Sequence, residues 1–122
     1  TGALLLGAAG LLEGYEATTH WAYTDLLPTF GARPAKGRVV RDRNRITAGG
    51  VTAGIDFALT LAAEIAGEAT AKAIQLGLEY DPAPPFRNGH PDVADPELVA
   101  AIKQRLRERQ AREEASSGDR ER

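Results

Sequence analysis

Apolar residues near the start of the chain predict a small, closely packed helix. Residues 2–13 show helical spacing, and Gly14 stands where a C-terminal cap is expected. The apolar residues that share one face of this helix are Leu4, Leu5, Ala8, Leu11 and Leu12. A helix of this kind packs against a sheet, so we expect at least one strand before Thr1. The chain is then expected to be the C-terminal part of a larger domain.

The next stretch alternates between short strands and a short helix. A strand is predicted over 16–20, and a helix over 22–30 that is closed by Gly31. Residues 39–42 and 45–48 flank a turn and predict a hairpin. This alternation is typical of a layered α/β fold.

Two further helices are predicted after a pair of glycines. The first has Thr52 as its expected cap and ends at Gly67. The second resumes over 68–79. The apolar positions of these two helices are Ile55, Leu59, Ala62, Ile65, Ala71, Ile74 and Leu78.

The pattern changes beyond Tyr80. Three prolines among residues 82–85 forbid a helix, and an irregular loop is expected through 88–91. Asp95 is expected to cap a final helix that has Pro96 at its first position. This helix carries an apolar stripe at Leu98, Ile102 and Leu106, and it is expected to fray from Ser116 onward.

Composition narrows the possible functions. The 122 residues give room for one domain or most of one, and the net charge of −2 argues against a dedicated nucleic-acid surface. No apolar run approaches the roughly 20 residues needed to span a bilayer. The chain has no cysteine, which excludes disulfides, thiolate ligands and a cysteine nucleophile within these residues. Without a signal sequence, the cytoplasm is the expected compartment.

Thr1 and Gly2 begin the first predicted helix and are candidates for chemistry. A helix N-terminus presents unpaired amides and a partial positive charge, which stabilise a thiolate or an oxyanion. Gly2 leaves the approach to this end uncrowded, and the Thr1 hydroxyl can bond a catalytic partner. The alternative is that Thr1 only caps a structural helix.

Two other positions are candidates for a binding site. His20 ends a predicted strand, where α/β sheets form ligand crevices, although a structural hydrogen-bonding role is equally open. The backbone of Gly49–Gly50–Val51 can approach another segment or a ligand, and the alternative is a tight turn. Asp56 is interpreted as structural, because a carboxylate is favoured in the first turn of a helix. His90 has no second ligand nearby in sequence, so no metal site is expected.

Four stretches, in this order, resemble the ThiJ/PfpI superfamily of flavodoxin-like proteins. They are TGALLLGAAGLL (1–12), ATTHW (17–21), RITAGGVTAGIDFAL (45–59) and AIQLGLEYDPAPPF (73–86). The first three are shared widely in the superfamily, including the sensor domains of some AraC-type regulators. The fourth is narrower and is similar to the isonitrile hydratases.

The resemblance implies a fold and a reaction. The fold is α/β, a flavodoxin-like three-layer sandwich whose N-terminal half is missing here. The reaction is the hydration of an isonitrile to an N-substituted formamide, catalysed by a carbon–oxygen lyase. The family's nucleophile is a cysteine directly followed by Thr-Gly, so the implied nucleophile lies just before Thr1. An acidic general acid/base is implied in the missing half, and the chain alone is expected to be inactive.

The resemblance also implies roles for individual residues. Thr1 is the implied catalytic residue, which orients the acid or the water, while its amide stabilises developing charge. Residues Gly2 and Gly49–Val51 are implied to support the nucleophile, and His20 to line or support the pocket. No metal or organic cofactor is implied, and the expected partner is a small isonitrile rather than nucleic acid or a membrane. The intact protein is expected to be a homodimer.

Two alternatives stay open at the level of sequence. One is the ligand-sensing domain of an AraC-type transcription regulator, although such a protein needs a downstream pair of helix-turn-helix units. The other is a stress-response or glyoxalase-like member with the same cysteine and a different substrate. In each case we expect residues 1–91 to be the C-terminal part of a ThiJ/PfpI-type domain. Residues 92–122 are expected to form a charged helix and a disordered tail.

Overall fold

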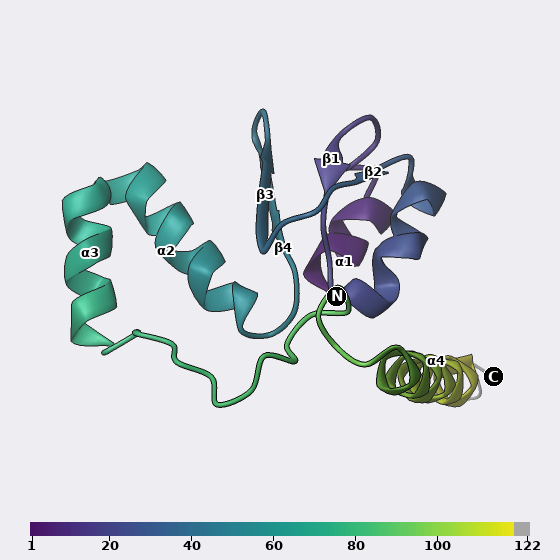
Figure 1. The fold of residues 1–122 in the computed structure, drawn as a ribbon. Helices are drawn as coiled ribbons and strands as arrows, with labels where there is room; N and C mark the ends of the chain where they lie inside the picture. The colour runs from purple at the N-terminus through teal and green to yellow at the C-terminus, as the bar shows by residue number, and fades with distance from the viewer. Residues whose placement is uncertain (119–122) are drawn as a thin grey trace. The chain divides into compact units, whose positions relative to one another are not determined.

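The computed structural model describes residues 1–118, which fall into two units. Unit 1 is Thr1–Ala83, and unit 2 begins at Pro84. The elements of unit 1 (Figure 1) are α1 (Gly2–Ala8), β1 (Glu16–Ala17), the 3₁₀ helix η1 (Trp21–Phe30), β2 (Arg33–Pro34), β3 (Val39–Asp42), β4 (Arg45–Ala48), α2 (Ala53–Ala66) and α3 (Glu68–Gly77).

The first helix is shorter than its apolar pattern predicts. It ends at Ala8, because Gly10 takes a left-handed conformation with φ of 73°. The predicted apolar face is confirmed for Leu12, which is fully buried, and for Leu4, which packs against the core. It is wrong for Leu5, which is 72% exposed, and the buried positions within α1 itself are Ala3 and Gly7. Gly14 also has positive φ, but it lies in a later turn and does not cap the helix.

Small residues allow α1 and η1 to pack closely. The core of unit 1 is formed by Ala3, Leu12, Ala17, Leu27 and Ala32, with Leu4 and Leu6 packed against it. A Cβ atom at Gly7 would lie 2.7 Å from the Phe30 ring, which is too close for any side chain. Glycine at position 7 is therefore a packing requirement.

The strands form two small sheets. β1 pairs with β2 in parallel, with Glu16 opposite Arg33. β3 and β4 form the predicted antiparallel hairpin, with Val39 opposite Ala48. The predicted strand over 16–20 is confirmed only for its first two residues. At Thr18 the backbone N–H donates to a side chain rather than to a neighbouring strand.

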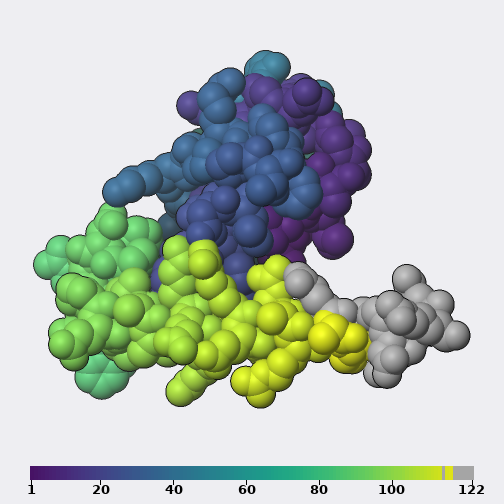
Figure 2. Space-filling model, turned by 90° about the vertical axis from the view of Figure 1, so that its right-hand side faces the viewer, coloured from purple at the N-terminus to yellow at the C-terminus, as the bar shows by residue number. Residues whose placement is uncertain are grey.

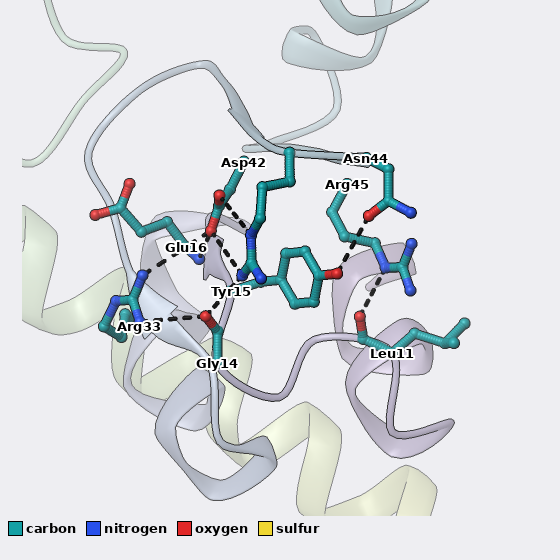
Figure 3. Close-up of polar contacts among 9 residues, drawn as sticks. Leu11, Gly14, Tyr15, Glu16, Arg33, Asp42, Asn44 and Arg45 are labelled. Atoms are coloured by element: carbon teal, nitrogen blue, oxygen red, sulfur yellow. Dashed lines mark hydrogen bonds and ion pairs between the residues drawn. The ribbon is translucent and has the colours of Figure 1, made fainter.

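A group of polar residues, which we call the Tyr15 cluster, joins the hairpin to the segment before β1 (Figure 3). The Arg43 guanidinium lies 3.6 Å from the centre of the Tyr15 ring, as in a cation–π contact. The Asp42 carboxylate accepts from the backbone N–H of Glu16 at 2.8 Å. Arg45 donates to the backbone carbonyl of Leu11 at 2.8 Å. These bonds fix the hairpin against the α1–β1 connection.

The two predicted helices after the glycine pair are confirmed, with one local difference. Gly67, with φ of 89°, separates α2 from α3. Thr52 occupies the N-cap position, but its side chain makes no capping hydrogen bond. Its hydroxyl instead accepts from Arg38 at 3.3 Å. The buried positions of these helices are Ala53 and Ala71, while Ile65 and Leu76 are exposed.

Unit 2 contains one long helix, α4 (Pro96–Gly118), which Figure 2 shows along its length in green to yellow. Asp95 caps it as predicted, accepting from the N–H of Glu97 at 2.8 Å. The expected fraying from residue 116 is wrong for 116–118, which continue the helix after i,i+4 ion pairs such as Arg109–Glu113. The rest of the predicted tail, 119–122, lies outside the described residues. Within the described part of the chain, every helix is too short or too polar to cross a membrane.

We predict that Gly7→Ala destabilises unit 1 by about 1–3 kcal/mol, because the added methyl group overlaps the Phe30 ring. The matched control is Gly54→Ala in α2, where an added Cβ meets nothing within 4 Å. This control should be neutral or stabilise the protein by about 0.5–1 kcal/mol. Urea unfolding of both variants measures the difference. Equal stabilities would contradict the packing role of Gly7.

Candidate functional site

Buried threonines fix the segment that leaves β1 and leads to His20. Thr18 and Thr19 are both buried, and Thr18 donates its backbone N–H to the Thr47 hydroxyl at 2.9 Å. Thr47 is itself buried on β4. A buried hydrogen bond of this kind holds the segment in one position against the hairpin.

His20 stands at the N-cap of η1. Its Nδ1 accepts from the backbone N–H of Ala22 at 3.2 Å. In the neutral imidazole the proton therefore sits on Nε2, which is left as a donor. The ring lies beside two aromatic rings, with centroids 5.4 Å from Trp21 and 5.7 Å from Tyr23. The helix cap thus fixes both the tautomer and the orientation of His20. Burial lowers the pKa of His20.

The Gly49–Gly50 turn lies against this segment. A Cβ atom at Gly50 would lie 3.2 Å from Cδ2 of His20, and one at Gly49 would lie 3.8 Å from the carbonyl oxygen of Thr19. Neither glycine has a positive φ. Close approach to His20, rather than an unusual backbone conformation, is therefore what favours glycine at position 50. The structure brings together two regions that the sequence analysis singled out separately.

The N-terminal end of α1 is open to solvent. Thr1 is exposed and makes no side-chain capping hydrogen bond to α1. A Cβ at Gly2 would meet nothing within 4 Å, so this end of the helix is uncrowded.

Val51 is placed differently from its glycine neighbours. Its side chain is 94% exposed, and its carbonyl accepts from the N–H of Gly54 at 3.1 Å. Only its backbone is held in the turn. The supporting roles of Gly2, Gly49, Gly50 and Val51, and the role of Thr1, stay predictions.

A polar network that the sequence pattern does not predict lies next to the glycine turn. The Asp56 carboxylate accepts from Arg38 and, at 2.6 Å, from the Tyr80 hydroxyl. The bond from Tyr80 and the Arg38 guanidinium lower the pKa of Asp56, while the carboxylate raises the pKa of Tyr80. Asp56 lies in the first turn of α2, as the sequence predicts, but the spacing along the chain does not indicate Arg38 as its partner. The only signal for Tyr80 was its place in the fourth stretch, 73–86.

The comparisons with known proteins identify the family. The model of the DJ-1/PfpI family matches residues 1–64. The chain belongs to this family, and its fold class is α/β, as the resemblance implied.

Individual relatives make the comparison more specific. The chain is 64% identical over 105 residues to an isonitrile hydratase from Pseudomonas putida, a match that covers 86% of this chain and 46% of the relative. It is also 70% identical over 27 residues to an uncharacterized protein in the cpoL 5′ region of Streptomyces lividans, covering 22% of this chain and 19% of that protein. The chain therefore spans less than half the length of the curated relatives it matches.

Solved structures agree with this assignment. A ThiJ/PfpI family protein from Pseudomonas syringae matches with a TM-score of 0.83 and 51% identity, covering 88% of this chain and 44% of that one. A mutant of DJ-1 from Schizosaccharomyces pombe matches with a TM-score of 0.57 and 25% identity, covering 66% of this chain and 41% of that one.

We predict that His20 titrates below its ordinary value of 6.5 in the folded chain. The unfolded chain then binds this proton more readily, so the contribution of His20 to stability is complete above about pH 6.5 and is lost as the pH falls through the folded-state pKa. Histidine-selective NMR measures the pKa, and urea unfolding at several pH values measures the stability. The His20→Gln variant should lose this part of the pH dependence. A His20 pKa at or above 6.5 would contradict the prediction.

Proposed function

We propose that this chain carries the C-terminal part of an isonitrile hydratase, which adds water to an isonitrile to give an N-substituted formamide. The observation that carries the proposal is the 64% identity, over 86% of this chain, to a protein named isonitrile hydratase. The contact between Gly50 and His20 supports it, because it joins two of the stretches on which the resemblance rests.

The proposed chemistry uses a cysteine directly before Thr1. The thiolate attacks the electrophilic isonitrile carbon, which takes up a proton to give a thioimidate. Water then adds to the same carbon. The C–S bond breaks, and the products are the formamide and the free thiol. The proposed enzyme is a carbon–oxygen lyase that needs no metal or organic cofactor.

Thr1 is proposed to orient the acid or the water that reacts with the thioimidate. Its hydroxyl is exposed and is not used to cap α1, which leaves it available for this role. The backbone amide of Thr1 is proposed to stabilise the negative charge that develops during the reaction. The absence of a side chain at Gly2 keeps the approach to both groups open.

His20 and the glycine turn are proposed to support the pocket. Burial favours the neutral imidazole, whose Nδ1 is occupied by the Ala22 N–H. The Nε2–H is then the group that His20 presents. The Gly49–Gly50 turn lies close to this segment and is proposed to limit its movement. For the intact protein we further propose a homodimer in the cytoplasm, with an isonitrile as substrate and neither nucleic acid nor a membrane as partner.

The test of this function uses an extended protein. In it, the chain is joined through a cysteine placed directly before Thr1 to the N-terminal part of the Pseudomonas putida relative. We expect this protein to form N-cyclohexylformamide from cyclohexyl isocyanide, measured by chromatography, and to lose activity when that cysteine is changed to serine. The 122-residue chain alone should be inactive, because it contains no cysteine. Absence of formamide from the folded extended protein, or turnover by the chain alone, would contradict the proposal.

We predict that Thr1→Val lowers kcat of the extended protein by about 10²-fold, because valine keeps the shape of threonine but lacks the hydroxyl that orients the acid or water. The matched control is Thr70→Val, which removes the hydroxyl of an exposed threonine on α3 and should change kcat by less than about twofold. Steady-state formamide formation measures both. Activity of Thr1→Val close to that of the control would reduce Thr1 to a helix-terminal residue.

A further inference from the structure

Arg38 holds both ends of the glycine turn. Its backbone carbonyl accepts the N–H of Gly49 at 2.9 Å. Its guanidinium donates to the Thr52 hydroxyl at 3.3 Å and to the Asp56 carboxylate in the first turn of α2. A single residue before β3 therefore fixes the start of the turn, its last residue and the helix that follows.

Tyr80 completes this arrangement from the far end of α3. Its hydroxyl donates to the second oxygen of Asp56 at 2.6 Å. Its own position is fixed by two bonds with Gln75, one from the Gln75 side chain to the Tyr80 carbonyl and one from the Tyr80 N–H to the Gln75 carbonyl, each 3.1 Å long. The Tyr80 hydroxyl orients the Asp56 carboxylate so that its other oxygen can accept the hydrogen bond from Arg38.

We propose that Arg38, Asp56 and Tyr80, which we call the Arg38 network, are positioning residues that hold the Gly49–Gly50 turn against His20. Among the described contacts, the network forms no hydrogen bond to His20 or to the end of α1, so it acts through the turn. Its effect on turnover rests on the function proposed above, whereas its effect on the contact between Gly50 and His20 does not.

The tightness of the contact explains why the turn needs such an anchor. A Cβ added at Gly50 would lie 3.2 Å from Cδ2 of His20, so the backbone of the turn runs close to the ring. A movement of the turn away from the ring would open this approach to water. Between Gly49 and Thr52 lie only two residues, so fixing both ends leaves the turn little freedom. Small displacements of groups that position a reaction have large effects on rate.

The ion pair by itself adds little to global stability. The Arg38 and Asp56 side chains are 58% and 28% exposed, and pairs of this exposure contribute little because water screens them. The network is therefore expected to matter for the geometry of the turn more than for the free energy of unfolding.

The chain offers a matched control in the ion pair between Arg41 and Glu64. It also links β3 to α2, and its side chains are 55% and 41% exposed. It does not bond the glycine turn among the described contacts. Removing it tests the loss of a hairpin-to-helix ion pair without releasing the turn.

The experiment compares Asp56→Asn, Tyr80→Phe and Arg38→Lys with Arg41→Ala and Glu64→Gln. The His20 pKa is measured by NMR both in the chain and in the extended protein. If the two proteins give different results, the result for the extended protein is decisive. The kcat of the extended protein is measured with cyclohexyl isocyanide. We expect Asp56→Asn to raise the His20 pKa toward its ordinary value, as water reaches the ring, and to lower kcat by about tenfold. Arg38→Lys, which keeps the charge, and Tyr80→Phe should have smaller effects in the same direction. The controls should leave the pKa unchanged and kcat within about twofold.

Two results would overturn the proposal. One is an unchanged His20 pKa in every folded network variant, which would make the network merely structural. The other is an equal shift in network and control variants. Tyr80→Phe removes only one hydroxyl and keeps the comparison usable if Asp56→Asn fails to fold. If the extended protein makes no formamide at all, the proposed function fails, but the NMR comparison still decides the role of the network.

Discussion

The approach of the Gly50 backbone to the His20 ring is the constraint on which the candidate site depends. Glycine suits position 50, because an added Cβ would crowd the His20 ring at 3.2 Å. The approach brings the segment after β1 against the entry to α2. Both the segment that contains His20 and the glycine turn are held by further hydrogen bonds. Thr47 and the Ala22 N–H hold the segment that contains His20, and Arg38 holds the turn. In the candidate site, the Gly49–Gly50 backbone therefore lies against the segment that contains His20, whose ring has a fixed orientation.

Two polar groups on the hairpin support this contact from different sides. The Tyr15 cluster joins the tip of the hairpin to the segment before β1. The Arg38 network joins the base of the hairpin to α2 and to Tyr80, three residues after the end of α3. Both use arginines that combine charge with several directed donors, which suits them to bonding carbonyls and carboxylates together. The hairpin is therefore the element through which the early and late stretches of the family pattern act on one another.

Sequence patterns predicted the type of most elements better than their ends or buried faces. The hairpin, the short helix closed by Gly31 and the break at Gly67 are confirmed, because turn residues and glycine act locally. The length of α1 was wrong because leucines continue the helical spacing past Gly10, where the backbone turns away. Its buried face was only partly predicted, because close packing against Phe30 requires glycine at position 7, whereas Leu5 is exposed.

By itself, the sequence determined the family and the α/β class, because these depend on motifs and on their order along the chain. It also singled out candidate site residues, whose roles stay predictions. Only the tertiary structure decided that Gly50 meets His20 and that the turn is tied to Arg38, Asp56 and Tyr80. The Arg38–Asp56 and Asp56–Tyr80 bonds, for example, join residues that are 18 and 24 positions apart. Spacing along a chain carries no information about contacts of that kind, because they are set by how separate elements pack and not by the periodicity of any one of them.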